Sequence, residues 1–284
     1  MSSYRILARG GVALLLLAVV VAAGAQVASI RLPHPAPRIA AVQRAHPWQL
    51  VQTTRSGPAG RSPIRVLVIG ASLSHGLGAS TPGHDYVSEL RRMIAQRTGR
   101  PVSTTVWSRT GARIATSDRW TLPPGQQIVI TQLITNDFFA GTPLLSYQSG
   151  ATALLQRVRD TSPRASVLCL GAWEGAFSID RMGVPVSAYN AIDQHACAVR
   201  HAAYLSLSPI FQIRACRGPK GRPTAFGRGD DFHPNDRGHQ RLAAAILKQL
   251  VREHAVPAPG ARPGSGTNSG VADQGKPTPA AQPG

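Results

Sequence analysis

The stretch RVLVIGASLSHGLGAS, residues 65–80, changes character in its middle. It begins as an apolar, β-branched run of the kind that forms buried strands. The run ends at Gly70, and Ser72 follows among small residues and glycines. The pattern predicts a buried strand that ends in a tight turn, with the Ser72 hydroxyl presented on that turn.

Strand-like apolar runs recur along the chain and alternate with helical patterns. The predicted strands cover residues 64–69, 102–107, 128–134, 165–170 and 203–207. Helical periodicity is clear in YVSELRRMIAQRTG, which places Val87, Leu90 and Ile94 on one face and ends at Gly99, and it recurs over 146–160 and 239–254. Strands that alternate with helices predict an α/β fold with a parallel sheet covered on both faces.

Composition divides the 284 residues into four parts. Residues 1–30 place Arg5 and Arg9 ahead of an apolar stretch, which predicts export through either a cleaved signal peptide or a retained membrane anchor. Residues 31–63 and 256–284 are rich in proline and glycine, so we expect a linker before the folded part and a disordered tail after it. A single domain is expected over 64–255. The protein is then either secreted or anchored facing outward.

The formal net charge of +18 favours anionic partners, such as a membrane surface or a wall polymer. A nucleic-acid partner is not expected, because the arginines are scattered and aromatic residues make up only 5% of the chain. The three cysteines lack metal-ligand spacing, so no metal is expected. In an exported protein, Cys197 and Cys216 are candidates to pair, whereas Cys169, inside an apolar run, is predicted to be a buried thiol.

Chemistry-bearing residues follow several of the predicted strands. In a parallel sheet the carboxyl ends of the strands share one edge, where ligands bind. Ser72 follows the first strand, and GRGDDFHPND places Asp230 three residues before His233, ahead of the last helix. That spacing lets the carboxylate accept from one ring nitrogen while the other faces a nucleophile. Asp231 is a competing acid, and His75 and His84 are competing bases without an acid at this spacing.

Two middle segments supply groups suited to an oxyanion. Gly111 follows the second strand and offers a backbone N–H, and Asn136 follows the third and offers an amide. Both would lie at the edge where Ser72 attacks. Turn glycines and turn asparagines are common, but the combination in this order points to nucleophilic catalysis.

In these residues the chain resembles the SGNH hydrolases, the GDSL esterase and lipase superfamily. Their four blocks supply Ser, Gly, Asn and His in that order. GASLS matches the first block, Gly111 the second, ITND the third and DDFH the last, over about 64–254. The sequence departs from the family pattern at Ala71, where the family has Asp, and at Ile134, where it has Gly. The resemblance implies a flavodoxin-like three-layer α/β/α sandwich with about five parallel strands.

The resemblance also implies a serine esterase without a cofactor, with Ser72, Asp230 and His233 as the triad. The N–H groups of Ser72 and Gly111 and the Asn136 amide would form the oxyanion hole. We expect a small-molecule or glycan ester as substrate, with 121–127, 138–144 and 172–186 as pocket loops and with Phe138, Phe139 and Trp173 as lining or core residues. Two alternatives stay open: an O-acyltransferase that uses the same serine, and a non-catalytic envelope binding module.

Overall fold

A computed structural model describes residues 49–56 and 62–258. Its main sheet has six strands in the order β1-β3-β2-β4-β5-β6. The strands are β1 Gln49–Ser56, β2 Ile64–Gly70, β3 Val102–Ser108, β4 Ile128–Gln132, β5 Ser166–Leu170 and β6 Ala203–Leu205. Strands β2 to β6 are parallel, and β1 runs antiparallel to β3 at the edge.

The strand order fixes where a ligand can bind. Counted from β2, the five parallel strands lie in the order 2-1-3-4-5, which is the flavodoxin-like arrangement. The direction of winding changes between β2 and β4, and sheets of this kind bind ligands beyond the carboxyl ends of the strands at that point. The predicted fold class is confirmed.

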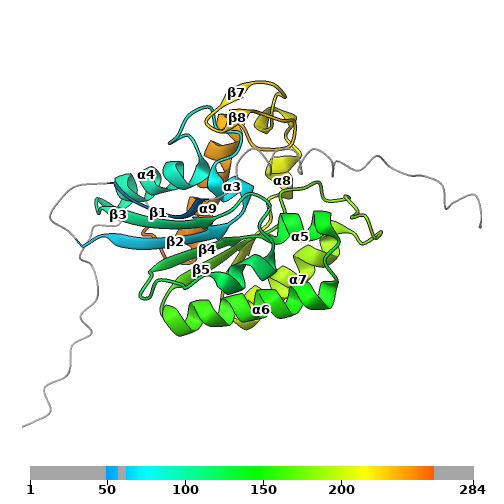
Figure 1. The fold of residues 1–284 in the computed structure, drawn as a ribbon. Coiled ribbons are helices and arrows are strands. Elements are labelled where there is room, and N and C mark those ends of the chain that lie inside the picture. Colours follow the sequence, from blue (N-terminus) through cyan, green and yellow to red (C-terminus); the bar gives the residue numbers. More distant parts are fainter. Residues whose placement is uncertain (1–48, 57–61, 259–284) are drawn as a thin grey trace, which may run out of the picture. The chain divides into compact units, whose positions relative to one another are not determined.

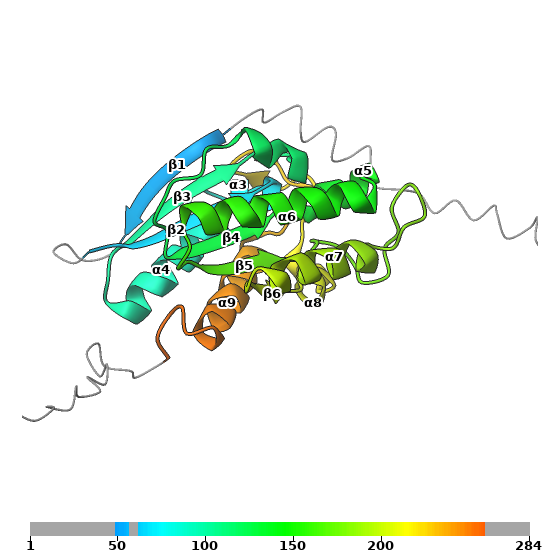
Figure 2. The ribbon, with the colours of Figure 1, turned by 90° about the horizontal axis from the view of Figure 1, so that it is seen from below.

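Helices cover both faces of the sheet (Figures 1 and 2). The longer helices are α4 Tyr86–Thr98, α6 Leu144–Thr161, α7 Val186–Val199 and α9 Asp236–Arg252. Helices α6 and α7 contribute to one apolar cluster, and α4 and α9 to the other. Strand β2 serves both, because Leu67 and Ile69 belong to the first cluster and Val66 and Val68 to the second.

Short elements shape the carboxyl edge of the sheet. They are α3 Ser72–His75, α5 Ile134–Ala140, α8 Ser208–Phe211, the 3-10 turns η2 Ile114–Arg119 and η3 Arg214–Cys216, and the strand pair β7 Pro223–Thr224 and β8 Gly227–Arg228. The run predicted as a strand over 128–134 divides here. Strand β4 stops at Gln132, and Ile134 begins α5, so Asn136 lies on a short helix.

Strand β1 was not predicted. It lies inside the segment 31–63, whose proline and glycine content indicates a linker. Its residues QLVQTTRS lack an apolar run, and the strand exists through antiparallel pairing with β3, from Gln52 opposite Val106 to Ser56 opposite Val102. Such pairing depends on residues about 50 positions away, which local patterning does not reveal.

The disulfide joins Cys169 to Cys197, with a Cα–Cα distance of 6.5 Å. The predicted pairing of Cys197 with Cys216 is therefore wrong, and Cys216 is a buried free thiol. The reason is the packing of the layers: Cys169 on β5 and Cys197 on α7 belong to the same apolar cluster. Burial of Cys169 was predicted correctly, but its prediction as a thiol is wrong, because it is bonded to Cys197.

The predicted export segment over 1–30 and most of the predicted tail over 256–284 lie outside the described residues. Among the helices that are described, none has the length and apolar character needed to cross a membrane.

Candidate active site

His233 and Asp230 form a hydrogen-bonded pair in the loop before α9. The Nδ1–H of His233 donates to Oδ2 of Asp230 at 2.7 Å. The other carboxylate oxygen, Oδ1, accepts from the backbone N–H groups of Phe232 at 2.9 Å and His233 at 2.7 Å. The carboxylate therefore fixes both the loop and the ring. With the proton on Nδ1, Nε2 is left as the acceptor that a general base requires.

The site environment keeps Asp230 ionised. Burial acts to raise the pKa of Asp230, but the hydrogen bond and charge of His233 and the two backbone N–H groups outweigh it and lower the pKa to about 2. The side chains of His233 and Asp230 are only 4% and 13% exposed. A nearly buried, charged carboxylate is suited to stabilising an imidazolium.

Ser72 is the first residue of α3, two positions after the end of β2, and is 7% exposed. At the start of a helix, backbone N–H groups have no carbonyl one turn earlier to bind, so they are available to bind an anion. Gly70 makes this turn possible. A Cβ at Gly70 would lie 1.9 Å from the Ser74 hydroxyl oxygen, so no side chain fits there.

The Ser72 turn packs against the loop that carries His233. The Leu77 N–H donates to the Ser72 carbonyl at 3.0 Å, and the next residue, Gly78, adjoins the His233 loop. A Cβ at Gly78 would lie 2.1 Å from the Pro234 carbonyl oxygen and 3.2 Å from the His233 Cβ. In the described part of the chain, no hydrogen bond links the Ser72 hydroxyl to His233. Their direct contact stays a prediction.

Asn136 and Gly111 are brought together at the same edge. The Asn136 Nδ2 donates to the carbonyl of Ala112, next to Gly111, at 2.9 Å. Gly111 has φ +76°, a conformation that favours glycine. The Arg109 N–H donates to the Gly70 carbonyl at 3.4 Å, which ties this loop to the end of β2. The loops after β2, β3 and β4 thus meet at the winding change.

Asp137 on α5 forms hydrogen bonds that support the loop carrying Gly111. Its carboxylate accepts from the Ile114 N–H at 2.7 Å and from the Thr142 hydroxyl at 2.9 Å. Burial raises the pKa of Asp137 to about 6, despite those hydrogen bonds and the charge of Arg113. Its contacts join α5 to the loop after β3 and to Thr142, which follows the C-terminal end of α5, so we assign it a supporting role.

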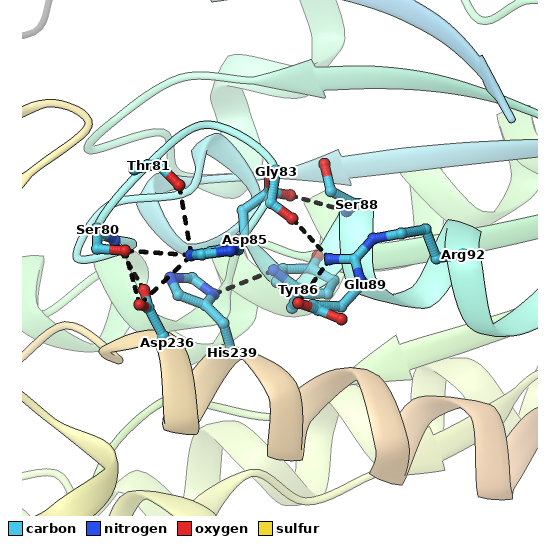
Figure 3. A network of polar contacts seen from close by, with 11 residues as sticks. Ser80, Thr81, Gly83, Asp85, Tyr86, Ser88, Glu89, Arg92, Asp236 and His239 are labelled. Atoms are coloured by element: carbon cyan, nitrogen blue, oxygen red, sulfur yellow. Dashed lines mark hydrogen bonds and ion pairs between the residues drawn. The ribbon is translucent and has the colours of Figure 1, made fainter.

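A second polar network supports the Ser72 turn and was not predicted. Figure 3 shows two of its members, His239 and Tyr86. His239 on α9 is fully buried. Its Nδ1 accepts from the Tyr86 N–H at 3.2 Å, and its Nε2–H donates to the Leu77 carbonyl at 3.0 Å. The Tyr86 hydroxyl in turn bonds the Ser74 hydroxyl at 2.7 Å. Because Leu77 is 162 residues from His239, no local motif could have revealed this link.

The competing residues have other partners. Asp231 accepts from the Arg214 guanidinium at 3.0 Å, and His75 Nδ1 lies 3.3 Å from the Ser108 hydroxyl. His84 does lie near an acid: its Nδ1 is 3.5 Å from Oδ2 of Asp236. That carboxylate also accepts from the backbone N–H and the hydroxyl of Ser80, so it ties the 80–85 loop to the start of α9.

The aromatic residues near the site are either core residues or half-buried residues beside His233. Trp173 and Phe138 are fully buried and belong to the core. Phe139 and Phe232 are half-buried, and their ring centroids lie 5.4 Å apart. Phe232 also packs edge-on against the His233 ring, with 5.2 Å between the ring centroids. This pair of rings therefore lines the side of the site that adjoins His233.

The described residues contain one cluster with metal-ligating atoms, formed by Cys169, Asp193 and Cys197. The two sulfurs are joined in the disulfide, and thiolates are the form that binds metal. The cluster is therefore not a metal site in this state.

The comparison with protein families gives a match over residues 68–241 to the GDSL-like lipase/acylhydrolase family. The chain belongs to this family. Its two departures from the family pattern, Ala71 and Ile134, are both buried and belong to the apolar cluster beneath α6 and α7. A comparison with curated proteins gives no match.

Three solved structures illustrate the fold. A carbohydrate esterase family 2 enzyme with a carbohydrate binding domain, from Corynascus thermopiles (Myceliophthora fergusii), has a TM-score of 0.51 and 14% identity over 69% of this chain and 68% of that chain. A possible lipase from Chitinophaga pinensis has a TM-score of 0.52 and 14% identity over 67% of this chain and 99% of that chain. A salicylyl-acyltransferase from a tetracycline biosynthetic pathway has a TM-score of 0.54 and 16% identity over 69% of this chain and 56% of that chain.

Proposed function

We propose that the protein is a serine esterase that hydrolyses an acyl ester through an acyl-serine intermediate. The observation that carries the proposal is the buried Asp230–His233 pair, whose loop packs against the turn that follows β2 and contains Ser72. A nucleophile, an oriented imidazole and a third group that orients it are the parts that acyl transfer requires.

In the first half of the reaction, Nε2 of His233 takes the proton from the Ser72 hydroxyl as its oxygen attacks the ester carbonyl. The N–H groups of Ser72 and Gly111 and the Asn136 amide stabilise the oxyanion. Asp230 stabilises the imidazolium through the 2.7 Å hydrogen bond. His233 then passes the proton to the leaving alcohol, and the acyl group stays on Ser72.

In the second half, His233 takes a proton from a water molecule, whose oxygen attacks the acyl-serine. The bond between the acyl carbon and the Ser72 oxygen then breaks, His233 returns the proton to the Ser72 oxygen, and the acid is released. Each step moves one proton through His233 and needs no further cofactor. We propose an acyl ester, such as an acetyl ester, on a cell-envelope glycan or lipid as the substrate class. The half-buried rings of Phe139 and Phe232 support it, because aromatic faces bind sugar rings and acyl chains alike.

A transferase is the second candidate, because a salicylyl-acyltransferase shares the fold. It would use the same acyl-serine and pass the acyl group to a hydroxyl acceptor in place of water. The two functions differ only in the second half of the reaction, so their products distinguish them.

The test is turnover of a p-nitrophenyl ester series of increasing acyl length and of acetylated oligosaccharides, with Ser72→Ala as the blank. Each reaction is run with and without an added alcohol or glycan acceptor. We expect release of acid above the blank, and an esterified acceptor would assign the transferase instead. A wild-type rate equal to the blank on all substrates, in folded protein that an active-site phosphonate does not label, would contradict both enzymes and favour a binding module.

A further inference from the structure

The loop after β5 exposes an unusual amount of apolar surface. Five large apolar side chains of the described residues are markedly exposed: Leu145, Phe177, Ile179, Met182 and Val199. Three of them lie on residues 176–185, which we call the apolar loop, with Phe177 at 95% and Met182 at 69% exposure. In Figure 1 this loop, between β5 and α7, projects beyond α5 at the carboxyl edge of the sheet.

Asp180 forms the hydrogen bonds that shape the turn of the apolar loop. Its Oδ1 accepts from the backbone N–H groups of Met182 and Val184, both at 2.8 Å, and its Oδ2 accepts from the Tyr189 hydroxyl at 3.0 Å. Ile179 pairs with Pro185 in an antiparallel bridge. In this conformation Phe177 and Met182 leave their apolar side chains exposed to water, which is unfavourable.

The charge pattern of the apolar loop identifies what could cover it. Asp180 is 3% exposed, so its charge is held inside the loop. Arg181 is the single charged side chain that the loop exposes, and it stands next to Met182 at the tip. Exposed apolar side chains beside a cation match the boundary of a membrane with anionic headgroups.

A neighbouring element extends the same surface. A Cβ at Gly141, where α5 ends, would lie 2.9 Å from the Met182 side chain, so the tip of the loop packs against that end. Helix α6 begins three residues later and carries Leu145, which is 77% exposed. Together the loop and this helix start give a patch with apolar side chains on two adjacent elements.

We propose that the apolar loop docks on an anionic membrane surface, with Phe177 and Met182 entering the headgroup boundary and Arg181 binding the headgroups. The patch lies at the same sheet edge as Ser72, so docking would hold the site at the bilayer. The proposal does not depend on turnover, and the net charge of +18 would add a general attraction to such a surface.

The test places a fluorescent reporter on the loop of the full chain. Phe177→Trp is compared with Val199→Trp, because Val199 is 55% exposed at the last residue of α7, away from the loop. Each variant is mixed with vesicles of phosphatidylglycerol and phosphatidylcholine whose acyl chains carry bromine, a short-range quencher. We expect the emission of Phe177→Trp to shift to shorter wavelength and to be quenched. Val199→Trp, with the same four native tryptophans, should change little.

Two double variants separate the apolar from the electrostatic contribution. Adding Met182→Ser to Phe177→Trp should weaken vesicle binding about 10-fold, the effect of losing one buried apolar side chain. Adding Arg181→Gln should weaken binding to anionic vesicles about 5-fold and leave binding to phosphatidylcholine alone unchanged.

Three results would overturn the proposal. One is the absence of quenching at position 177, and a second is equal quenching at positions 177 and 199, which would show attachment through another part of the chain. The third is a short-wavelength emission of Phe177→Trp before vesicles are added, which would show that the chain itself or a second copy covers the loop. None of these measurements records ester turnover, so their failure would leave the proposed esterase standing.

Discussion

The Nδ1 of His233 lies 2.7 Å from Oδ2 of Asp230, in a loop where the same carboxylate also binds two backbone N–H groups. One side chain thus sets the conformation of the loop, the tautomer of the ring and the electrostatics of the site. Removal of its charge should therefore affect catalysis and acid stability together.

Replacement of Asp230 by asparagine should lower kcat by about 10³–10⁴-fold, because the ring loses its orienting and charge-stabilising partner. The pKa of Asp230 is about 2 in the folded protein, below the ordinary value of about 3.9. Its contribution to the free energy of unfolding is complete above about pH 4 and is lost as the pH falls toward 2. Urea unfolding between pH 5 and 2 should therefore show a smaller acid-induced loss in Asp230→Asn.

Asp231→Asn is the matched control, because Asp231 is adjacent but binds the exposed Arg214 side chain. It should keep its kcat. A large loss of kcat in Asp231→Asn together with a small one in Asp230→Asn would reverse the assignment of the two acids.

Asn136→Ala should lower kcat about 10²–10³-fold with little change in KM, the usual effect of removing one oxyanion donor. The variant also loses the hydrogen bond to the Ala112 carbonyl, which costs about 1 kcal/mol of stability. Thr142→Val serves as the control, since it removes a hydrogen bond to Asp137 on the same helix without touching the oxyanion donors. If both variants lose kcat equally, the Asn136 effect is structural and not electrostatic.

The buried His239 should make the protein acid-sensitive. Burial lowers the pKa of His239 to about 4, although the hydrogen bond to the Leu77 carbonyl favours the protonated ring. Between about pH 6.5 and 4, His239 is therefore neutral in the folded protein, whereas the same histidine binds a proton in the unfolded chain. The contribution of His239 to the free energy of unfolding should therefore fall as the pH decreases from about 6.5 to 4, whereas the raised pKa of Asp137 acts in the opposite direction over part of this range. His239→Leu should lower the overall stability by leaving the Tyr86 N–H and the Leu77 carbonyl unbonded, yet flatten this slope.

Chemical denaturation at a series of pH values measures that slope. The exposed His195 provides a matched histidine, and His195→Gln should retain the wild-type slope. An unchanged slope in His239→Leu would show that another group controls the acid sensitivity.

The disulfide should stabilise the fold by closing a loop between residues 28 positions apart. In the chain-entropy treatment this amounts to about 3–4 kcal/mol. The double variant Cys169→Ala/Cys197→Ala should therefore unfold at a lower temperature by calorimetry and become insensitive to reductant. Cys216→Ala should remain sensitive to reductant, and the opposite pattern would restore the pairing of Cys197 with Cys216.

Local patterns predicted much of the fold because its central strands are locally distinctive. The apolar run before Gly70 and the three-residue spacing of Asp230 and His233 are each visible within a short segment. Each depends on strand burial or on loop geometry, which a few neighbouring residues determine. The position of Asn136 also followed from the end of a strand, although it lies on a helix and not in a turn.

The features that were missed depend on distant pairing. Strand β1 has a polar sequence and exists through β3, and the disulfide follows from how α7 lies on β5. His239 contacts Leu77 only because α9 packs beside the Ser72 turn. In each case the sequence supplies a residue type that fits several roles, and only the packing of the layers selects one.

The most direct test of the esterase is Ser72→Ala, with turnover, phosphonate labelling and thermal unfolding measured on the same preparation. The hydroxyl is small and lies at a helix start, so its removal should leave the melting temperature nearly unchanged. Mass spectrometry should locate the phosphonate on Ser72 in the wild type, and the variant should show neither label nor turnover. Wild-type turnover in Ser72→Ala, or a phosphonate attached to another serine, would contradict the mechanism.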